Sequence, residues 1–165
     1  MRNADELDGA NIQAPSYYLL SVKAACPHCG GETKVFALAV PAAHRWLHAD
    51  DDAAAPTWQD AVGPAVLFRI EGLAPAVRQR LQLLAPGYRP ARKESSAASP
   101  WLNHCDRCQE PLDEDELHCE PEGAFMPMGP AAAQAIDAKA VHQPLKASAS
   151  GYVPDAQWLQ SLRLG

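Results

Sequence analysis

A chain of 165 residues with a formal net charge of -6 can form one domain with a modest core, and its acidic balance disfavours non-specific binding to nucleic acid or to an anionic membrane. Fifteen prolines and ten glycines indicate many turns and few long helices. No apolar run reaches the length of about 18 residues that predicts a membrane span, and residues 1–13 contain no apolar signal core. We therefore expect a cytoplasmic protein.

The N-terminal part of the chain predicts a leader followed by a β-hairpin. Residues 1–15 are polar, end at a proline and are expected to be a disordered leader. Residues 17–24 can be divided into two alternating faces, and residues 33–40 are rich in Val, Phe and Leu, so each stretch predicts a strand. The two strands bracket Cys26-Pro27-His28-Cys29-Gly30. This order indicates an antiparallel hairpin whose tip carries two cysteines.

A loop and a third strand are expected next. Residues 42–63 include Asp50-Asp51-Asp52 and an Ala-rich run, which are typical of a solvated loop. A calcium site is not expected there, because the spaced oxygen ligands and the turn glycine of a calcium loop are missing. Residues 66–70 predict a strand whose inward-facing residues are Val66, Phe68 and Ile70.

The clearest helical pattern comes after this strand. Pro75 suits the first turn of a helix, and Pro86-Gly87 ends it. Apolar residues recur at helical spacing at Leu73, Val77, Leu81 and Leu84. We expect this helix to lie across the sheet.

A second Cys-x-x-Cys sequence is expected to sit in a second hairpin. Residues 88–99 are interpreted as an exposed connection, and a strand from Trp101 leads into Cys105-Asp106-Arg107-Cys108. Residues 117–119 are expected to begin a return strand that closes at Phe125. Further short helices are expected at 131–141 and 155–164.

Four of the five cysteines predict a metal centre. In a reducing compartment, paired cysteines are typical of metal-binding or catalytic sites rather than disulfides. Two Cys-x-x-Cys turns supply the four thiolates of a closed tetrahedral site. The sequence therefore predicts one structural zinc ion on Cys26, Cys29, Cys105 and Cys108, and leaves Cys119 as a strand thiol outside the site.

The residue after each pair distinguishes the two turns. Gly30 comes directly after the first pair, at a position that often requires positive φ. Gln109 stands at the same place after the second pair, where a non-glycine residue costs about 1 kcal/mol.

Other uses of these residues stay open. Cys-Pro-His-Cys also occurs in oxidising thioredoxin-like proteins, where it begins a helix that lowers the pKa of the first thiol, whereas in this chain it leads into a turn and a strand. A rubredoxin-like iron or an iron–sulfur centre fits four cysteines as well. His28 and His104 lie within or beside the turns and could each replace a sulfur, although four cysteines suffice.

No catalytic set accompanies the cysteines. The chain lacks His-Glu-x-x-His, a phosphate-binding glycine loop and a serine nucleophile elbow. Four thiolates leave no open position for a metal-bound water. The acidic run 113–116 is interpreted as a solvated face. We therefore predict no catalytic residue and no cofactor besides the metal.

Nucleic acid is the alternative ligand to weigh. Basic residues gather at Arg78, Arg80, Arg89, Arg92 and Lys93. If this cluster shared a face with Tyr88 and Trp101, phosphate contact with base stacking would become possible. The overall acidic charge instead favours a solvated helix face.

Residues 17–40 and 101–125 resemble a bacterial family of uncharacterised zinc-ribbon proteins, and residues 81–88 between them are also similar. The matching sequences are Tyr-Tyr-Leu-Leu-Ser-Val, Cys-Pro-His-Cys with Val-Phe-Ala-Leu-Ala-Val-Pro, Leu-Ala-Pro-Gly-Tyr, and Asn-His-Cys-x-x-Cys with Leu-His-Cys-Glu-Pro-Glu-Gly-Ala-Phe. The resemblance spans residues 17–125, loosely in the middle, and implies a zinc-binding pair of Cys turns. It implies no activity. Gln109 departs from the glycine that is often found after the second pair.

Together these patterns predict an α+β fold, with zinc-ribbon-like antiparallel β-hairpins and an inserted strand and helix that pack on the sheet. Its parts are a disordered leader at 1–15, a zinc-ribbon-like domain at 16–128 with loops at 42–63 and 88–99, and a C-terminal extension with short helices at 129–165. The predicted function is a non-enzymatic, zinc-stabilised binding module for a protein partner. The alternatives are a nucleic-acid-binding zinc ribbon and a thiol-disulfide redox protein that uses Cys26 and Cys29.

Overall fold

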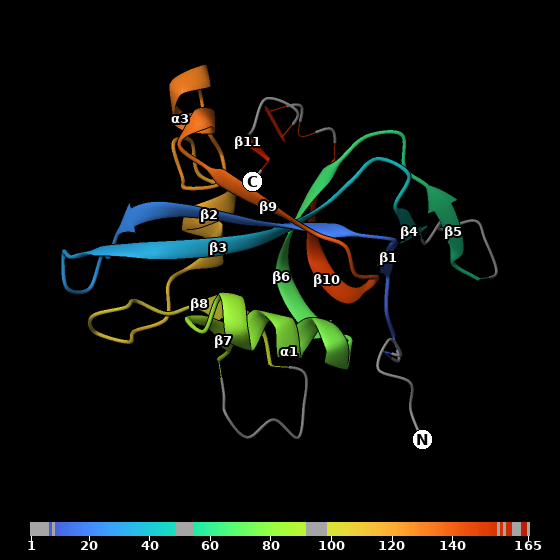
Figure 1. Ribbon diagram of the computed structural model, residues 1–165, viewed down its shortest axis with the longest axis horizontal. Helices are drawn as coiled ribbons and strands as arrows, with labels where there is room; N and C mark the ends of the chain where they lie inside the picture. Colours follow the sequence, from blue (N-terminus) through green and yellow to red (C-terminus); the bar gives the residue numbers. More distant parts are fainter. Residues whose placement is uncertain are drawn as a thin grey trace.

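A computed structural model of the chain describes residues 7, 9–48, 55–91, 99–154, 156, 158–159 and 163–164. Most of these residues belong to one long sheet (Figure 1). Its strands are β1 (Ile12–Ala14), β2 (Tyr17–Ala25), β3 (Glu32–Val40), β4 (Arg45–His48), β5 (Thr57–Asp60), β6 (Ala65–Leu73), β9 (Asp137–Val141), β10 (Leu145–Pro154) and β11 (Arg163–Leu164). The other elements are α1 (Pro75–Leu84), β7 (Tyr88–Pro90), β8 (Trp101–Asn103), α2 (Glu114–His118) and α3 (Pro130–Gln134).

Antiparallel pairing dominates the sheet. The strand order is β11-β9-β2-β3-β6-β10-β1-β4-β5, and each neighbouring pair is antiparallel except β11 and β9. β7 and β8 form a separate two-stranded ribbon. An antiparallel sheet with a few helices is the α+β class that the sequence predicts. Every helix in the described part of the chain is too short or too polar to cross a bilayer.

The β2–β3 hairpin is the central element. It pairs from Tyr18 opposite Ala39 to Ala25 opposite Glu32, as the two predicted strands require. The alternation expected for β2 is confirmed, because Leu19 and Leu20 belong to hydrophobic clusters on opposite faces. In Figure 1 this hairpin reaches far to one end of the molecule, so its tip projects beyond α1.

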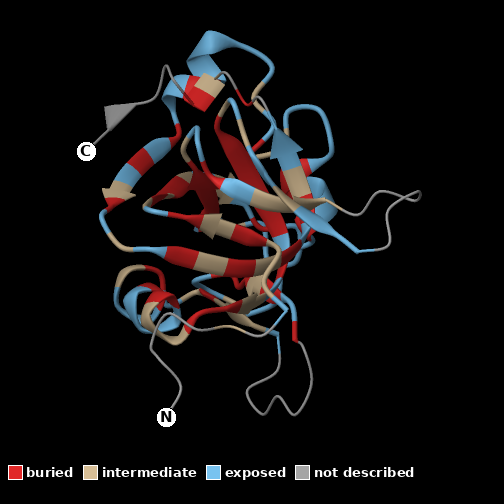
Figure 2. Cartoon of the chain, turned by 90° about the vertical axis from the view of Figure 1, so that its right-hand side faces the viewer, coloured by how far each residue is buried: buried red, intermediate tan, exposed pale blue. Residues whose placement is uncertain are grey.

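Each face of the sheet carries its own core, and buried residues line the central strands (Figure 2). The first core lies under α1 and the β7–β8 ribbon and includes Leu38, Leu67, Val77, Leu81 and Trp101. The second core lies on the other face and includes Leu20, Val35, Leu117, Phe125 and Ile136. Cys26 and Cys105 also belong to the second core, which places the metal ligands at its margin.

The predicted helix is confirmed as α1, with Pro75 in its first turn and Val77 and Leu81 buried. The predicted third strand is confirmed as part of β6, but its inward residues do not share a face. Val66 lies in the second core and Ile70 in the first. Arg69 adopts φ +49° between Phe68 and Ile70, and this irregularity reverses the alternation. The pairing with β10 also shifts register between Ile70 and Gly72.

Three expected irregular stretches contain strands. In the expected exposed connection at 88–99, residues 88–90 form β7 against β8, and Tyr88 is buried. Residues 12–14 form β1 between β10 and β4, so the expected leader does not extend to residue 15. Residues 42–63 contain the β4–β5 hairpin, where Trp46 stacks on Tyr152 of β10 with ring centroids 5.7 Å apart. The aspartates at 50–52 lie outside the described residues.

The region after the second cysteine pair also differs from expectation. Residues 114–118 form α2 rather than leading into a return strand, because the Asp113 side chain accepts hydrogen bonds from the N–H groups of Asp115 and Glu116. Acidic residues in the first turn also suit the positive end of the helix. The expected second hairpin, with a return strand from residues 117–119 to Phe125, is therefore wrong.

The C-terminal part of the chain adds strands to the sheet. A helix does begin beside Gly129, but α3 ends at Gln134 and residues 137–141 form β9 against β2. β10 was not expected, and it pairs with β6 and β1. Leu159 is buried in the second core with Trp158 packed against that core. The helix expected at 155–164 does not reach residue 164, because residues 163–164 form β11 against β9.

Two asparagine side chains hydrogen-bond to backbone groups at positions where a strand has no neighbouring strand. Asn103 Oδ1 accepts from the Phe36 N–H at 2.8 Å, and Asn103 Nδ2 donates to the Phe36 carbonyl at 2.9 Å. β3 pairs with β6 only over residues 38–40, so this amide takes the place of a missing strand. Asn11 binds Ala149 in the same way. Its Oδ1 accepts from the Ala149 N–H at 2.9 Å, and its Nδ2 donates to the Ala149 carbonyl at 2.7 Å.

We predict that Asn103→Ala destabilises the fold more than Asn11→Ala. Asn103 is 1% exposed, so its loss leaves two buried backbone groups unpaired and should lower the free energy of unfolding by roughly 3 kcal/mol. Asn11 is only partly buried, so water can replace its bonds at a cost of about 1 kcal/mol. Urea denaturation of both variants measures the difference. Equal losses in the free energy of unfolding would mean that the burial of the asparagine does not decide how much its removal destabilises the fold.

Candidate metal centre

The structure brings together the four cysteines predicted to bind metal. The sulfurs of Cys26, Cys29, Cys105 and Cys108 all lie within 4.8 Å of one another. Cys26 Sγ is 3.7 Å from Cys108 Sγ, and Cys29 Sγ is 3.7 Å from Cys105 Sγ. Zinc–sulfur bonds of about 2.3 Å in a tetrahedron give sulfur–sulfur edges of about 3.8 Å. The four sulfurs therefore have the spacing of a tetrahedral site.

The first Cys turn, residues 26–29, closes through two backbone hydrogen bonds at the tip of the β2–β3 hairpin. The Cys26 N–H donates to the Gly31 carbonyl at 2.8 Å, and the Gly30 N–H donates to the Cys26 carbonyl at 2.8 Å. Gly30 has φ +73°, which glycine adopts without steric cost. Both cysteine side chains can therefore point to the same side of the turn.

The second Cys turn, residues 105–108, repeats this pattern. The Cys105 N–H donates to the Glu110 carbonyl at 3.0 Å, and the Gln109 N–H donates to the Cys105 carbonyl at 3.0 Å. Gln109 takes φ +64°, the conformation of Gly30. Its side-chain amide donates to the Asp106 carbonyl at 3.2 Å and accepts from Arg89 at 3.3 Å. These bonds help to hold the strained residue in place.

Polar groups of β3 and the second turn fix the two turns against each other. The Asp106 N–H donates to Thr33 Oγ1 at 3.0 Å, and the Lys34 N–H donates to Asp106 Oδ2 at 3.2 Å. His28 Nε2 lies 3.3 Å from the Pro111 carbonyl oxygen. The hairpin tip and the second turn are thus connected by more than their sulfurs.

Two of the four sulfurs have shifted pKa values. The N–H groups of Cys108 and Arg107 lower the pKa of Cys105 to about 6. The backbone N–H of Glu110 favours the Cys108 thiolate too, but burial and the other three sulfurs outweigh it and raise the pKa of Cys108 to about 12. Four neighbouring thiolates need a cation among them, because each added negative charge opposes the next.

The three neighbours considered from sequence lie apart from the sulfur cluster. His104 Nδ1 lies 3.1 Å from the Gly87 carbonyl oxygen, and His28 contacts Pro111. Cys119 is exposed at the C-terminus of α2, with its sulfur 3.8 Å from Asp115 Oδ1. The expectation that Cys119 is a strand thiol is therefore wrong, because residues 114–118 form α2 and Cys119 is the residue that caps it.

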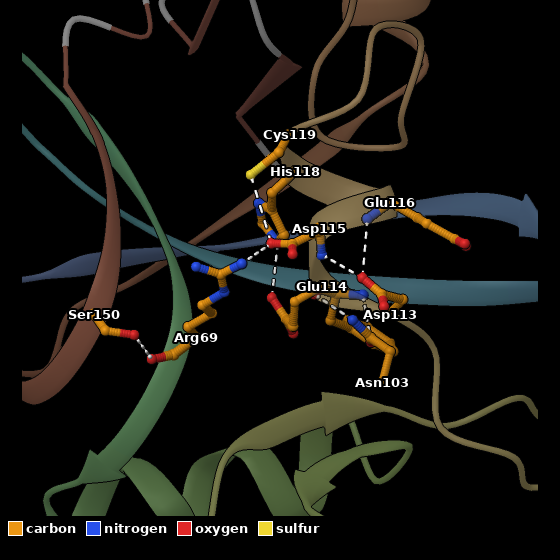
Figure 3. A network of polar contacts seen from close by, with 10 residues as sticks. Arg69, Asn103, Asp113, Glu114, Asp115, Glu116, His118, Cys119 and Ser150 are labelled. Carbon is orange, nitrogen blue, oxygen red and sulfur yellow. Dashed lines mark hydrogen bonds and ion pairs between the residues drawn. The ribbon is translucent and has the colours of Figure 1, made fainter.

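A second polar cluster on α2 was missed in the sequence (Figure 3). Glu114 and His118 are buried, and Glu114 Oε2 lies 3.3 Å from His118 Nε2. The His118 ring stacks between Phe68 and Phe125, with centroids 4.9 and 5.0 Å away. Arg69 pairs with the neighbouring Asp115. Glu114 and His118 are four residues apart, directly after a residue that caps helices, and this spacing could have predicted that they share one face of a helix.

Two atoms of this cluster have no hydrogen-bond partner within the described part of the chain, Glu114 Oε1 and His118 Nδ1. Burial raises the pKa of Glu114 to about 7, although the backbone N–H and the charge of Arg69 oppose the shift. Burial lowers the pKa of His118 to about 3. His118 is therefore neutral near pH 7, and Glu114 changes its charge there.

Comparison with known proteins identifies no relative. The sequence matches no protein-family model, no curated protein and no solved structure. The resemblance to zinc-ribbon proteins therefore stays a hypothesis from the sequence, and the function has to be inferred from the chemistry of the described residues.

We predict opposite effects for substitutions at the equivalent positions of the two turns. Gly30→Ala places a side chain at φ +73° and should lower the free energy of unfolding by about 1 kcal/mol. Gln109→Gly removes that strain and should raise it by up to about 1 kcal/mol, less the lost side-chain bonds. Thermal unfolding of the metal-loaded variants measures both. A stability gain from Gly30→Ala would contradict this account of the turns.

We also predict that Glu114→Gln changes how stability depends on pH. A folded-state pKa of about 7 against an ordinary 4.5 means that ionisation disfavours the fold as pH rises between these values. The variant should therefore gain roughly 3 kcal/mol relative to the wild type across that range. Glu116→Gln, on the exposed side of α2, is the control and should show little change. If stability depended on pH in the same way in Glu114→Gln and in the wild type, the raised pKa of Glu114 would be refuted.

Proposed function

We propose that Cys26, Cys29, Cys105 and Cys108 hold one zinc ion and that the chain is a non-enzymatic, zinc-stabilised binding module for a protein partner. The observation that carries the metal assignment is the pair of 3.7 Å sulfur–sulfur distances across the two turns. They match the edges of a zinc–thiolate tetrahedron. The matching hydrogen bonds of the two turns support the same reading.

The proposed ion would be structural. Four sulfurs fill the coordination shell of zinc and leave no position for water or substrate. The ligands come from turns that are 76 residues apart between Cys29 and Cys105, so the ion would cross-link distant parts of the chain. Such a site does not exist in the unfolded chain, and metal binding would add directly to the free energy of folding.

Two observations weigh against the alternative functions. Tyr88 and Trp101 are 2% and 4% exposed and pack against each other, so they offer no stacking surface for bases. Arg92 and Lys93 lie outside the described residues. The first Cys turn joins two strands, so it lacks the helix N-terminus that lowers the thiol pKa in thioredoxin-like proteins. A protein partner therefore remains the best supported ligand class.

Elemental analysis of the purified protein is the direct test. We expect one zinc ion per chain, and iron in its place would redirect the assignment to a rubredoxin-like centre. Removal of the ion with a chelator should unfold the hairpin tip and the second turn, which circular dichroism and amide hydrogen exchange would detect. A metal-free chain with an unchanged melting temperature would refute the structural role.

We predict that Cys26→Ser and Cys105→Ser each lower the melting temperature sharply and abolish stoichiometric zinc binding, because each removes one of four ligands. Cys119→Ser is the matched control, since this thiol is exposed and outside the cluster. It should leave both the melting temperature and the zinc content unchanged. Equal losses in all three variants would mean that the ligand set is wrong.

A further inference from the structure

A groove lies beside the proposed metal centre. Its volume is about 750 Å³, and it runs between the first Cys turn, β6 and residues 111–116. The first turn contributes Pro27 and His28, and β6 contributes Arg69 and Glu71. Pro100 and Leu102, at the start of β8, and Ser150 of β10 complete the lining, so the groove joins five separate parts of the chain.

Negative charge dominates the lining of the groove. Five of its residues carry carboxyl groups, namely Glu71, Asp113, Glu114, Asp115 and Glu116. Arg69 is the one lysine or arginine in this lining, and it already pairs with Asp115. The remaining lining is largely apolar, with Pro27, Leu102 and Leu112 among its residues. The groove thus combines apolar surface with an acidic wall whose charge Arg69 compensates only in part.

Glu114 is the buried member of this acidic set. It is 6% exposed, and Figure 3 shows its carboxylate on the side of α2 that faces Arg69. Glu114 Oε1 has no hydrogen-bond donor among the described residues. A buried carboxylate oxygen without a donor is unfavourable. This oxygen has almost no accessible surface, so it contributes negative charge from behind the groove wall. The exposed carboxylates of Glu71, Asp115 and Glu116 are the ones that a positively charged donor can contact.

We propose that this groove binds an arginine side chain of an extended basic segment in a partner protein. The inference rests on the proposed function and names the chemistry of its partner. A guanidinium group offers several donors in one plane and suits paired carboxylates, while its apolar stem suits proline and leucine surface. Nucleic acid does not fit, because its phosphates would face the acidic wall.

A metal ion is a poorer fit for the same residues. Within the described chain, the sulfur cluster is the one set of three or more His, Cys, Asp or Glu ligand atoms that converges on a point. The groove carboxylates instead spread over β6 and residues 113–116. Charge distributed along a groove suits an extended segment with more than one basic residue.

The test is a fluorescence anisotropy titration of the full, zinc-loaded chain with a labelled peptide of alternating arginine, proline and leucine. The matched probe replaces each arginine with citrulline, which keeps the shape and removes the charge. We expect the arginine peptide to bind at least about tenfold more tightly than the citrulline peptide. Equal affinities, or no binding of either peptide, would overturn the proposal.

Variants of the chain locate the binding. Glu116→Gln and Glu71→Gln should each weaken binding of the arginine peptide about tenfold, because both carboxylates are exposed in the groove lining. Glu120→Gln removes the same charge from an exposed residue outside the groove lining and should have little effect. Circular dichroism checks that each variant is folded. Equal weakening by all three variants would indicate non-specific attraction and would refute the groove.

Failure of this inference is distinguishable from failure of the proposed metal centre. A chain that binds zinc but not the arginine peptide would refute the groove and leave the metal assignment standing. A chain that purifies without metal would refute the metal assignment, and the same peptide titration would still decide the groove. Tighter binding of a single-stranded oligonucleotide than of the arginine peptide would overturn the choice of partner.

Discussion

The convergence of four sulfurs is the constraint on which the arrangement of the distant segments depends. Cys26 and Cys108 are 82 residues apart, yet their sulfurs lie 3.7 Å from each other. Thiolates at this spacing repel one another unless a cation lies among them. A bound ion would therefore fix the projecting tip of the β2–β3 hairpin to the second turn. It would also close one end of the second core, to which Cys26 and Cys105 belong.

The two Cys turns share their internal hydrogen bonds but not their surroundings. The first joins two long strands, whereas the second lies between the short strand β8 and α2. The pattern of a Cys-x-x-Cys turn is local, so the sequence predicted both turns and the clustering of their four sulfurs. The element that comes after each turn is decided by other residues. Asp113 caps a helix, and this one side chain replaced the expected return strand with α2.

Elements with strong local patterns were predictable, and those formed by tertiary pairing were not. The bulky residues of β2, β3 and α1 repeat at strand or helix spacing, which made these elements visible. β10 also alternates, but its buried positions include Ala147, Ala149 and Gly151, so its hydrophobic signal is weak. β9 contains good helix formers and becomes a strand because it pairs with β2. The helix propensity of residues 137–141 is therefore outweighed by the backbone hydrogen bonds that they make to β2.

The same reasoning explains why the acidic run at 113–116 was misread as a uniformly solvated face. Composition treats these four residues alike, but a helix that begins after Asp113 turns Glu114, Leu117 and His118 toward the interior and leaves Asp115 and Glu116 exposed. The start of α2 therefore decides which carboxylate is buried. That choice places a titratable carboxylate between an aromatic stack and a groove whose other wall is the first Cys turn. Metal-dependent folding and recognition would then share one surface, because the turn that carries two ligands also forms part of the groove.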